Sequence, residues 1–188
     1  MRSTASAKDL INSSEKYFEE FHFLPPKIAP KSVQEIFPIG GRWMKKILRR
    51  LEKRPLPRQN PCFQDLGYFK YGFAVWTAFI TLCLFSPLGI PIASLTAFLA
   101  FYAVEAQMVF LFPLAIEGAP NPLYQSFLET RRAGGTVKVM ATVMFIAVYM
   151  VSGIFRMASW KRTWCIGCLA VLLWHVRLKK ARNSHENL

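Results

Sequence analysis

YGFAVWTAFITLCLFSPLGIPIASLTAFLAFYAVEAQMVFLFPLAI, residues 71–116, is the stretch that decides the fold of this chain. Glu105 is its only residue with a formal charge. As one helix the stretch would be roughly 69 Å long, more than twice the ~30 Å hydrocarbon core of a bilayer. Two prolines and a glycine within Ser86–Pro91 interrupt a continuous helix. The stretch therefore predicts a transmembrane hairpin of two helices joined by a short, uncharged turn.

Composition and charge place the whole chain among membrane proteins. Its residues are 53% hydrophobic, and they form blocks in place of the dispersed pattern of a soluble core. The net charge of +13 reflects 24 Lys and Arg against 11 Asp and Glu. Because the basic residues flank apolar segments, anionic headgroups and the positive-inside rule explain them better than nucleic acid does. We expect no nucleic-acid partner.

Residues 1–67 form a polar, proline-rich arm ahead of the apolar segments. Met1–Lys16 lacks the apolar run of about 7–15 residues that a secretory signal requires, so we expect the internal segments to direct insertion. Apolar residues at helical spacing predict a short helix over Asp9–Phe23, ended by Pro25 and Pro26. We expect no compact core in this arm, because its apolar residues are few and interrupted.

The sequence GRWMKKILRRLEKR at 41–54 has the clearest helical pattern of the arm. Apolar side chains recur on one face and basic side chains occupy the rest, which is typical of a helix lying in a membrane interface. The interface residues that we predict are Trp43, Lys45, Lys46, Ile47, Leu48, Arg49, Arg50 and Leu51. In the alternative, the apolar face packs on the membrane helices and the charges are solvated. We favour surface attachment, since each basic residue near an anionic leaflet contributes about 1 kcal/mol.

Two further apolar segments follow the hairpin. Val139–Phe155 has no charged residue and is long enough for a third span with snorkelling ends. Thr163–Val176 gives only about 21 Å of helix, so it is either a mismatched fourth span or a re-entrant or interfacial segment. The membrane domain is thus predicted over 68–180, with segments at about 68–87, 91–116, 136–157 and 162–177 and a polar tail at 181–188.

The distribution of basic residues favours four spans with both termini in the cytosol. A two-span hairpin places the arm and the Arg131–Arg132 loop on the same, cytosolic side. A third span then leads to an outer loop with Arg156, Lys161 and Arg162. Without a fourth span, the outer side would also hold Arg177, Lys179, Lys180 and Arg182, which is less favourable.

Glu105 and Gln107 are the intramembrane polar residues that we single out. A carboxylate in a membrane helix costs a few kcal/mol or more and is commonly paired, neutral or functional. We expect Glu105 near mid-bilayer depth, with Tyr102 and Gln107 as neighbours that could share hydrogen bonds. The functional interpretation is a proton or cation relay, and the structural one is a polar contact that fixes helix packing. We favour the structural role, because no predicted span holds a second acidic residue.

Cys165 and Cys168 have Cys-x-x-Cys spacing at the start of the fourth apolar segment. A helix N-terminus favours the thiolate form, so this spacing is typical of a redox pair. In position the pair resembles that of the four-helix vitamin K epoxide reductase and disulfide-forming membrane proteins, which implies thiol–disulfide exchange. Those enzymes use a second cysteine pair in an outer loop, whereas here Cys62 lies in the arm and Cys83 within a span. We therefore favour two small packing residues, and we expect no catalytic, metal or cofactor site.

The layout of the first 116 residues is similar to that of chlamydial inclusion-membrane proteins. The shared features are a polar, serine-rich start without a secretory signal and a two-lobed apolar hairpin with a tight turn; no diagnostic motif is present. The resemblance implies secretion by a specialised apparatus and insertion into a host-vacuole membrane, with both termini facing the host cytosol. A bacterial inner membrane is the alternative location.

The sequence thus predicts an all-α, multi-pass helical membrane protein with about four hydrophobic segments, a tight hairpin and a basic, proline-rich N-terminal arm. Its predicted function is a non-catalytic scaffold or interaction role. The arm would bind anionic lipid headgroups or an unknown protein partner, self-association included. The alternatives are a membrane thiol–disulfide oxidoreductase using Cys165 and Cys168, and a small transporter subunit centred on Glu105. No cofactor is expected.

Overall fold

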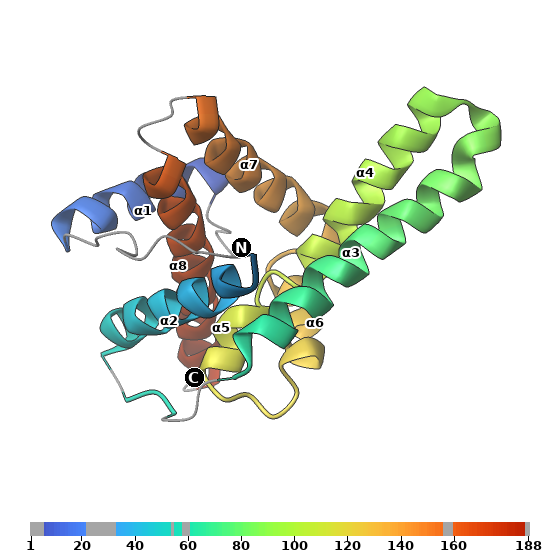
Figure 1. Cartoon of the computed structure of the whole chain (residues 1–188). Helices are drawn as coiled ribbons and strands as arrows, with labels where there is room; N and C mark the ends of the chain where they lie inside the picture. Colours follow the sequence, from blue (N-terminus) through green and yellow to red (C-terminus); the bar gives the residue numbers. More distant parts are fainter. Residues whose placement is uncertain (1–5, 22–32, 54, 58–60, 156–159, 187–188) are drawn as a thin grey trace.

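The computed structural model describes residues 6–21, 33–53, 55–57, 61–155 and 160–186, and within them it contains helices and no strand. In chain order the elements are α1 (Ala7–Glu20), α2 (Val33–Glu52), α3 (Phe63–Phe85), η1 (Ser86–Leu88), α4 (Ile90–Gln107), α5 (Leu111–Ile116), α6 (Pro122–Arg132), α7 (Thr136–Phe155) and α8 (Trp160–Glu186). Figure 1 shows a lobe of packed helices from which α3 and α4 project together as a hairpin. The all-α prediction is confirmed for the described part of the chain.

The hairpin turns at the prolines that interrupt the apolar stretch. Ser86–Leu88 forms a short 3-10 turn, and Gly89 follows it with a φ of 101°, a left-handed conformation that favours glycine. Pro91 lies in the first turn of α4, where a helix tolerates the missing N–H. The N–H of Gly89 donates to the carbonyl of Ser86 at 3.1 Å, so the turn satisfies part of its own backbone.

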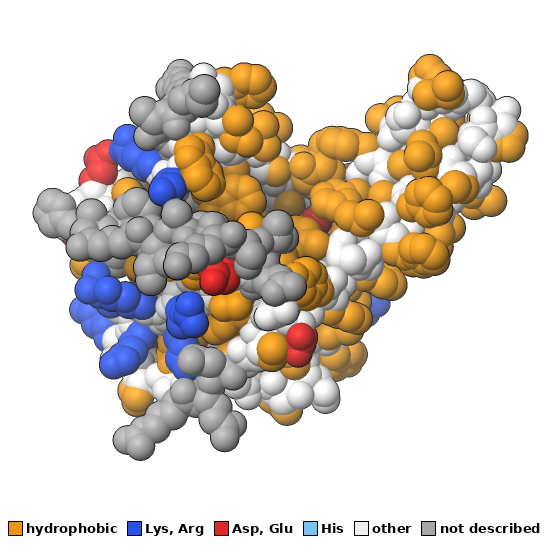
Figure 2. All heavy atoms as spheres, in the orientation of Figure 1, with side chains coloured by type: hydrophobic (Ala, Val, Ile, Leu, Met, Phe, Trp, Pro, Cys, Tyr) orange, Lys and Arg blue, Asp and Glu red, His pale blue; other side chains and the backbone are white. Residues whose placement is uncertain are grey.

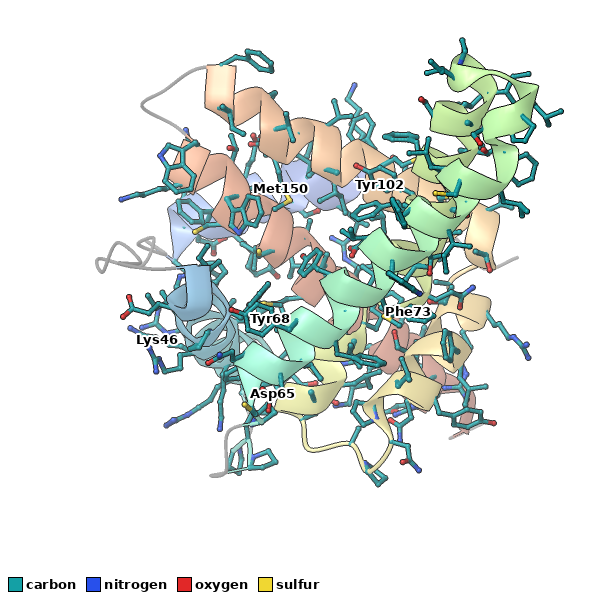
Figure 3. All side chains as sticks on the ribbon, turned by 45° about the vertical axis from the view of Figure 1, so that its right-hand side comes forward. Lys46, Asp65, Tyr68, Phe73, Tyr102 and Met150 are labelled. Carbon is teal, nitrogen blue, oxygen red and sulfur yellow. The ribbon has the colours of Figure 1, made fainter. Side chains whose placement is uncertain are left out.

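The outer part of the hairpin is covered by apolar side chains that contact little else in the protein. Trp76, Leu84 and Ile90 are 61%, 71% and 79% exposed, and Phe73 lies on the outside of α3 (Figure 3). Figure 2 shows hydrophobic side chains along the whole projecting hairpin. A soluble monomer rarely exposes so continuous an apolar surface. This surface is therefore suited to contact with lipid or with another protein.

Three stretches of the described chain are long and apolar enough to cross a membrane: Phe63–Leu88, Ile90–Ile116 and Thr136–Phe155. They coincide with the first three predicted segments. The second stretch is not one straight helix, because α4 ends at Gln107 and α5 begins at Leu111. Helix α8, which contains the fourth predicted segment, is not among the three. The structure therefore supports three candidate spans, and the predicted number of four is not reached.

Helix α8 is the central helix of the lobe, which explains why it is apolar. Its Ile166, Leu169 and Leu172 are completely buried, and it packs against α1, α2 and α7. One apolar cluster joins α8 to α1, α4 and α7, and a second joins it to α2, α3 and α5. The ring of Phe110 meets that of Trp174 edge-on at 5.2 Å between centroids. The fourth segment is thus a core helix of the lobe.

Helix α1 lies along α8 and covers one side of it. A capping box between Ser6 and Asp9 starts the helix, close to the predicted range of Asp9–Phe23. Leu10 is completely buried in the cluster that it shares with α7 and α8. The arm therefore differs from our expectation: α1 and α2 bury apolar side chains against α8 and belong to the core of the lobe.

Helix α2 is held against the base of the hairpin by a reciprocal contact. The ring of Phe63 on α3 lies over Gly41, and the ring of Phe37 on α2 lies over Gly67. A Cβ atom at either glycine would come within 2.3 Å of the facing ring, so a larger residue would push the helices apart. The helix begins eight residues before the predicted 41–54 and continues through Pro38. This longer course supplies the contact of Phe37.

Candidate functional site

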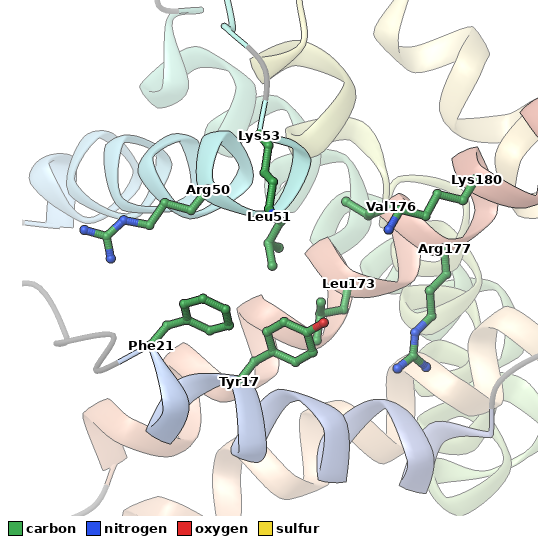
Figure 4. A pocket seen from close by; sticks show the side chains of 9 residues that line it. All are labelled: Tyr17, Phe21, Arg50, Leu51, Lys53, Leu173, Val176, Arg177 and Lys180. Atoms are coloured by element: carbon green, nitrogen blue, oxygen red, sulfur yellow. The ribbon is translucent and has the colours of Figure 1, made fainter.

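A basic pocket of about 370 Å³ lies between α1, α2 and α8 (Figure 4). Its lining consists of Tyr17 and Phe21 at the end of α1, Arg50, Leu51 and Lys53 at the end of α2, and Leu173, Val176, Arg177 and Lys180 on α8. Four of these nine residues are basic, and none is acidic. We refer to it below as the basic pocket.

The basic pocket joins residues that are far apart in the sequence. Arg50 and Lys53 belong to the amphipathic segment, whereas Arg177 and Lys180 are one turn apart on α8. The Nη2 of Arg177 donates to Ser13 Oγ at 2.8 Å, which holds this side chain against α1. A concentration of basic side chains around one cavity gives a positive potential, which attracts anions. The pocket is therefore suited to a phosphate-bearing or other anionic group.

The predicted interface helix has its apolar face inside the protein. Ile47 and Leu48 are 2% and 0% exposed and pack in the cluster with α8. Of the other predicted residues, Trp43, Lys45 and Leu51 are half-buried, and Lys46, Arg49 and Arg50 are exposed. Figure 2 shows the basic side chains gathered on the lobe, away from the tip of the hairpin. This arrangement agrees with the alternative in which the apolar face packs on other helices, and it leaves the basic face at the surface.

Glu105 forms an ion pair with Lys70, one residue outside the stretch that decides the fold. Lys70 Nζ and Glu105 Oε2 are 2.9 Å apart, and the two side chains are 8% and 10% exposed. The pair lies at the base of the hairpin, because Glu105 is near the end of α4 and Lys70 is in the first third of α3. The expected mid-bilayer depth of Glu105 was based on a helix that continues to Ile116. Because α4 ends at Gln107, Glu105 lies near the end of its helix and not in the middle of a span.

A signal for this ion pair is present in the sequence. Lys70 is 17 residues before Pro87, and Glu105 is 17 residues after Leu88. In a helical hairpin, residues at equal distances from the turn lie side by side on the antiparallel helices. The pair is missed when the apolar stretch is taken to begin at Tyr71.

The ion pair lies in an apolar cleft of about 280 Å³, which is bounded by the hairpin, α2, α7 and α8. Tyr102 on α4 and Met150 on α7 line this cleft from facing helices (Figure 3). Of the described residues that line it, only Lys70 and Glu105 are Lys, Arg, Asp or Glu. Glu105 Oε1 is buried and has no hydrogen-bond partner within the described part of the chain.

Gln107 and its neighbours fix the break between α4 and α5. Gln107 Nε2 donates to Thr136 Oγ1 at 2.6 Å. The carbonyls of Gln107 and Ala106 accept hydrogen bonds from Ser126 Oγ at 2.6 Å and Thr130 Oγ1 at 2.9 Å. Both hydroxyls belong to α6, which lies in the region expected to be a loop. Gln107 therefore has a packing role at the end of α4.

A second group of charged residues, absent from the predicted sites, ties α8 to α2 and α5. Lys179 Nζ lies 2.9 Å from Glu52 Oε1 and 2.8 Å from Glu117 Oε1, and His175 Nε2 lies 3.2 Å from the same oxygen of Glu117. Burial favours the neutral form of Glu117, but the close contact with His175 and the hydrogen bond from Lys179, with their charges, outweigh it and lower its pKa to about 2. No local spacing indicates this cluster, because its members come from three separate parts of the chain.

Cys165 and Cys168 lie on α8 inside the lobe. Since α8 begins at Trp160, the pair lies beyond the first helical turn. Burial raises the pKa of Cys165 to about 12, and it raises that of Cys168 to about 11 despite the charge of Lys70. The thiolate is the reactive form, so these thiols are weak nucleophiles near neutral pH. Both cysteines are free thiols in the structure.

The described residues contain no group of three or more His, Cys, Asp or Glu side chains placed to hold a metal ion. The sites to interpret are therefore the basic pocket and the apolar cleft. Comparison of the chain with protein-family models, with curated proteins and with solved structures gives no match.

Proposed function

We propose that this chain is a non-catalytic membrane protein that inserts the hairpin α3–α4 into a bilayer and binds anionic lipid headgroups in the basic pocket. The observation that carries the proposal is the described lining of that pocket, in which four side chains are cationic and none is acidic, in a chain that also exposes an apolar hairpin. The forked guanidinium group of arginine matches the geometry of the phosphate oxygens, and the ammonium group of lysine adds a compact positive charge. Tyr17 and Phe21 supply the amphipathic and aromatic contacts that are common at headgroup depth.

The same proposal places both termini and both ends of the hairpin on the cytosolic side. Helix α1 covers α8 and exposes Lys16, Glu19 and Glu20. Charges in the hydrocarbon core cost a few kcal/mol or more each, so α1 and the helix beneath it are better placed at the membrane surface. The hairpin then carries the insertion, in place of the four-span arrangement. The resemblance to inclusion-membrane proteins adds the proposal of a host-vacuole membrane.

Lipid binding to the full chain tests this function. The purified protein in detergent is titrated with phosphatidylglycerol or phosphatidylcholine, and bound lipid is counted by native mass spectrometry. We expect phosphatidylglycerol to bind more tightly and its affinity to fall with added salt, because exposed charges are screened. The Arg50→Gln/Arg177→Gln variant should lose affinity about tenfold or more, since each charge-assisted hydrogen bond contributes on the order of 1.5–3 kcal/mol.

A matched control separates the basic pocket from general surface charge. The Lys45→Gln/Lys46→Gln variant removes two positive charges, as the Arg50→Gln/Arg177→Gln variant does, but neither residue lines the pocket. It should bind phosphatidylglycerol nearly as well as the wild type. Equal losses in the two variants, or equal affinity for both lipids, would contradict a dedicated headgroup site.

A further inference from the structure

The apolar cleft contains a hydrogen-bond acceptor that the protein leaves unused. Glu105 Oε2 accepts from Lys70 at 2.9 Å, whereas Oε1 is buried and has no partner among the described residues. Buried polar atoms in native proteins nearly always have a partner, so an orphaned oxygen points to a ligand group. A carboxylate oxygen only accepts hydrogen bonds, and the group that completes the site must therefore be an O–H or N–H donor.

The charge balance of the apolar cleft favours an uncharged donor. Lys70 and Glu105 compensate each other, and no other described Lys, Arg, Asp or Glu lines the cleft. A cation at Glu105 would lie beside the Lys70 ammonium, and an anion would lie beside the Glu105 carboxylate. Either ion would be buried without full compensation, which is costly in an apolar site. A hydroxyl group satisfies the free oxygen without adding charge.

The apolar cleft opens toward surfaces that suit lipid. Figure 2 shows a notch between the hairpin and the lobe, with hydrophobic side chains on both walls and acidic atoms at its bottom. Its walls include α4 and α7, which both belong to candidate membrane spans. Side chains on these helices continue the apolar surface outward, with Leu99 at 40% and Val151 at 48% exposure. A ligand of the cleft would therefore arrive along a surface that a bilayer covers.

We infer that the apolar cleft binds a neutral membrane lipid with a free hydroxyl group, of the diacylglycerol class, whose hydroxyl donates to Glu105. The volume of about 280 Å³ is just below the range of roughly 300–1,000 Å³ for small-molecule sites. The cleft thus holds the headgroup and the start of one chain, and the rest of the lipid lies along α4 and α7. This site shares no lining residue with the basic pocket, so either proposal can fail without the other.

Photolabelling of the full chain in phosphatidylcholine nanodiscs tests the inference. One probe is a photoactivatable diacylglycerol with a free hydroxyl, and the second is the same molecule with that hydroxyl methylated. The first should label peptides of α4 and α7 around Tyr102 and Met150. The second should label them about tenfold less, because a hydrogen bond to a charged group is worth at least that factor. Equal labelling by the two probes would overturn the inference, and this comparison needs no variant of the protein.

Two neighbouring residues on α7 provide matched variants. Ala147 lines the cleft, whereas Val148 is 67% exposed on the outside of the helix. Ala147→Phe should fill the cleft and reduce labelling by the free-hydroxyl probe about tenfold, while Val148→Phe should leave it unchanged. Wild-type labelling of Ala147→Phe would show that the probe only coats the membrane surface of the protein, which also overturns the inference.

A third variant tests the role of Glu105 as the acceptor and leaves no unpaired charge buried in the cleft. Lys70→Met/Glu105→Leu replaces the ion pair by apolar side chains of similar size, an exchange that folded proteins often tolerate. This variant should retain its helical circular dichroism and lose the difference between the two probes. A difference that persists in it would show that Glu105 is not the acceptor.

Discussion

Glu105 is a buried carboxylate and Glu117 a half-buried one, and the two have different surroundings. Glu105 has one cationic partner, Lys70, and keeps an oxygen without a partner among the described residues. Glu117 instead meets both His175 and Lys179. The first carboxylate is thus suited to a ligand, whereas the second is committed to holding α8 in place. The number of donors around each group decides this difference.

The stability that Glu117 contributes should depend on pH. Its pKa is lowered from 4.5 to about 2 in the folded protein, so folding favours the ionised form. The contribution, on the order of 2 kcal/mol, is present above about pH 5 and is lost as the pH falls from about 4.5 through 2. Thermal unfolding of the wild type and Glu117→Gln should give a Tm difference that shrinks over this window. A difference that stays constant from pH 7 to pH 2 would contradict the assignment.

Helices α2 and α3 pack closely because a glycine on each helix leaves room for an aromatic ring of the other. Gly41 and Gly67 each receive a phenylalanine ring from the other helix, so the contact is antiparallel and specific in register. Close approach of this kind buries apolar area without a polar bond and is sensitive to a single methyl group. The contact sets where the amphipathic helix lies on the base of the hairpin.

Substitution of two glycines on α3 tests this contact. Gly67→Ala should destabilise the protein by about 1–3 kcal/mol, because its Cβ would lie within 2.3 Å of the Phe37 ring. Gly72→Ala is the matched control, since no atom lies within 4 Å of its Cβ position. The control should be neutral or stabilise α3 by up to about 1 kcal/mol through helix propensity. Unfolding midpoints that shift equally in the two variants would show that the contact does not matter.

Much of the fold was predictable from local pattern, and the exceptions have a common cause. Long apolar runs indicated α3, α4 and α7, because few other structures accommodate such runs. Thr163–Val176 was assigned as a span or interfacial segment because apolar composition alone does not distinguish a membrane helix from the core of a lobe. The amphipathic helix was predicted over 41–54, yet α2 begins at Val33 and continues through Pro38 with tertiary support from Phe37. Where tertiary packing determines the course or the environment of a helix, the local sequence pattern does not predict it.

The candidate sites were only half predictable for the same reason. Arg50 and Glu105 were identified by type, as a basic residue of an amphipathic helix and a charge within an apolar run. The residues that lie beside them were not identified. Arg177 and Lys180, for example, belong to the other end of the chain and join Arg50 in the basic pocket only in the folded protein. Lys70 could have been found by symmetry about the turn. A pocket that joins separate helices becomes visible only once the fold is known.

At the scale of the whole molecule, the part of the hairpin beyond the ion pair of Lys70 and Glu105 is shorter than a bilayer is thick. From Lys70 to Phe85 the helix rises about 22 Å, against a hydrocarbon core of ~30 Å. With the ion pair at headgroup depth, the turn at Ser86–Gly89 would lie within the hydrocarbon. Its lack of charged residues fits that position. The hairpin would then enter the membrane from the cytosolic side without emerging on the other.

Two native cysteines report on this insertion. Cys62 precedes α3 at the base of the hairpin, Cys83 is near its tip, and both are exposed in the protein. In nanodiscs, which expose both membrane faces, a water-soluble maleimide should modify Cys62 rapidly and Cys83 slowly, because hydrocarbon covers the latter. After denaturation in sodium dodecyl sulfate both should react. Rapid modification of Cys83 in the bilayer would show that the tip reaches water on the far side.

The interlocking rings of Phe37 and Phe63 have a mechanical consequence. They join α2 to α3, so a tilt of the hairpin turns the amphipathic helix and the mouth of the basic pocket with it. An inserted segment that is shorter than the hydrocarbon core is accommodated by local thinning of the bilayer, so a change in bilayer thickness would change the force on the hairpin and hence its orientation. Affinity for phosphatidylglycerol in nanodiscs should then change with the acyl-chain length of the neutral carrier lipid. Through the contact of α2 with α3, membrane thickness would then control the direction in which the basic pocket faces.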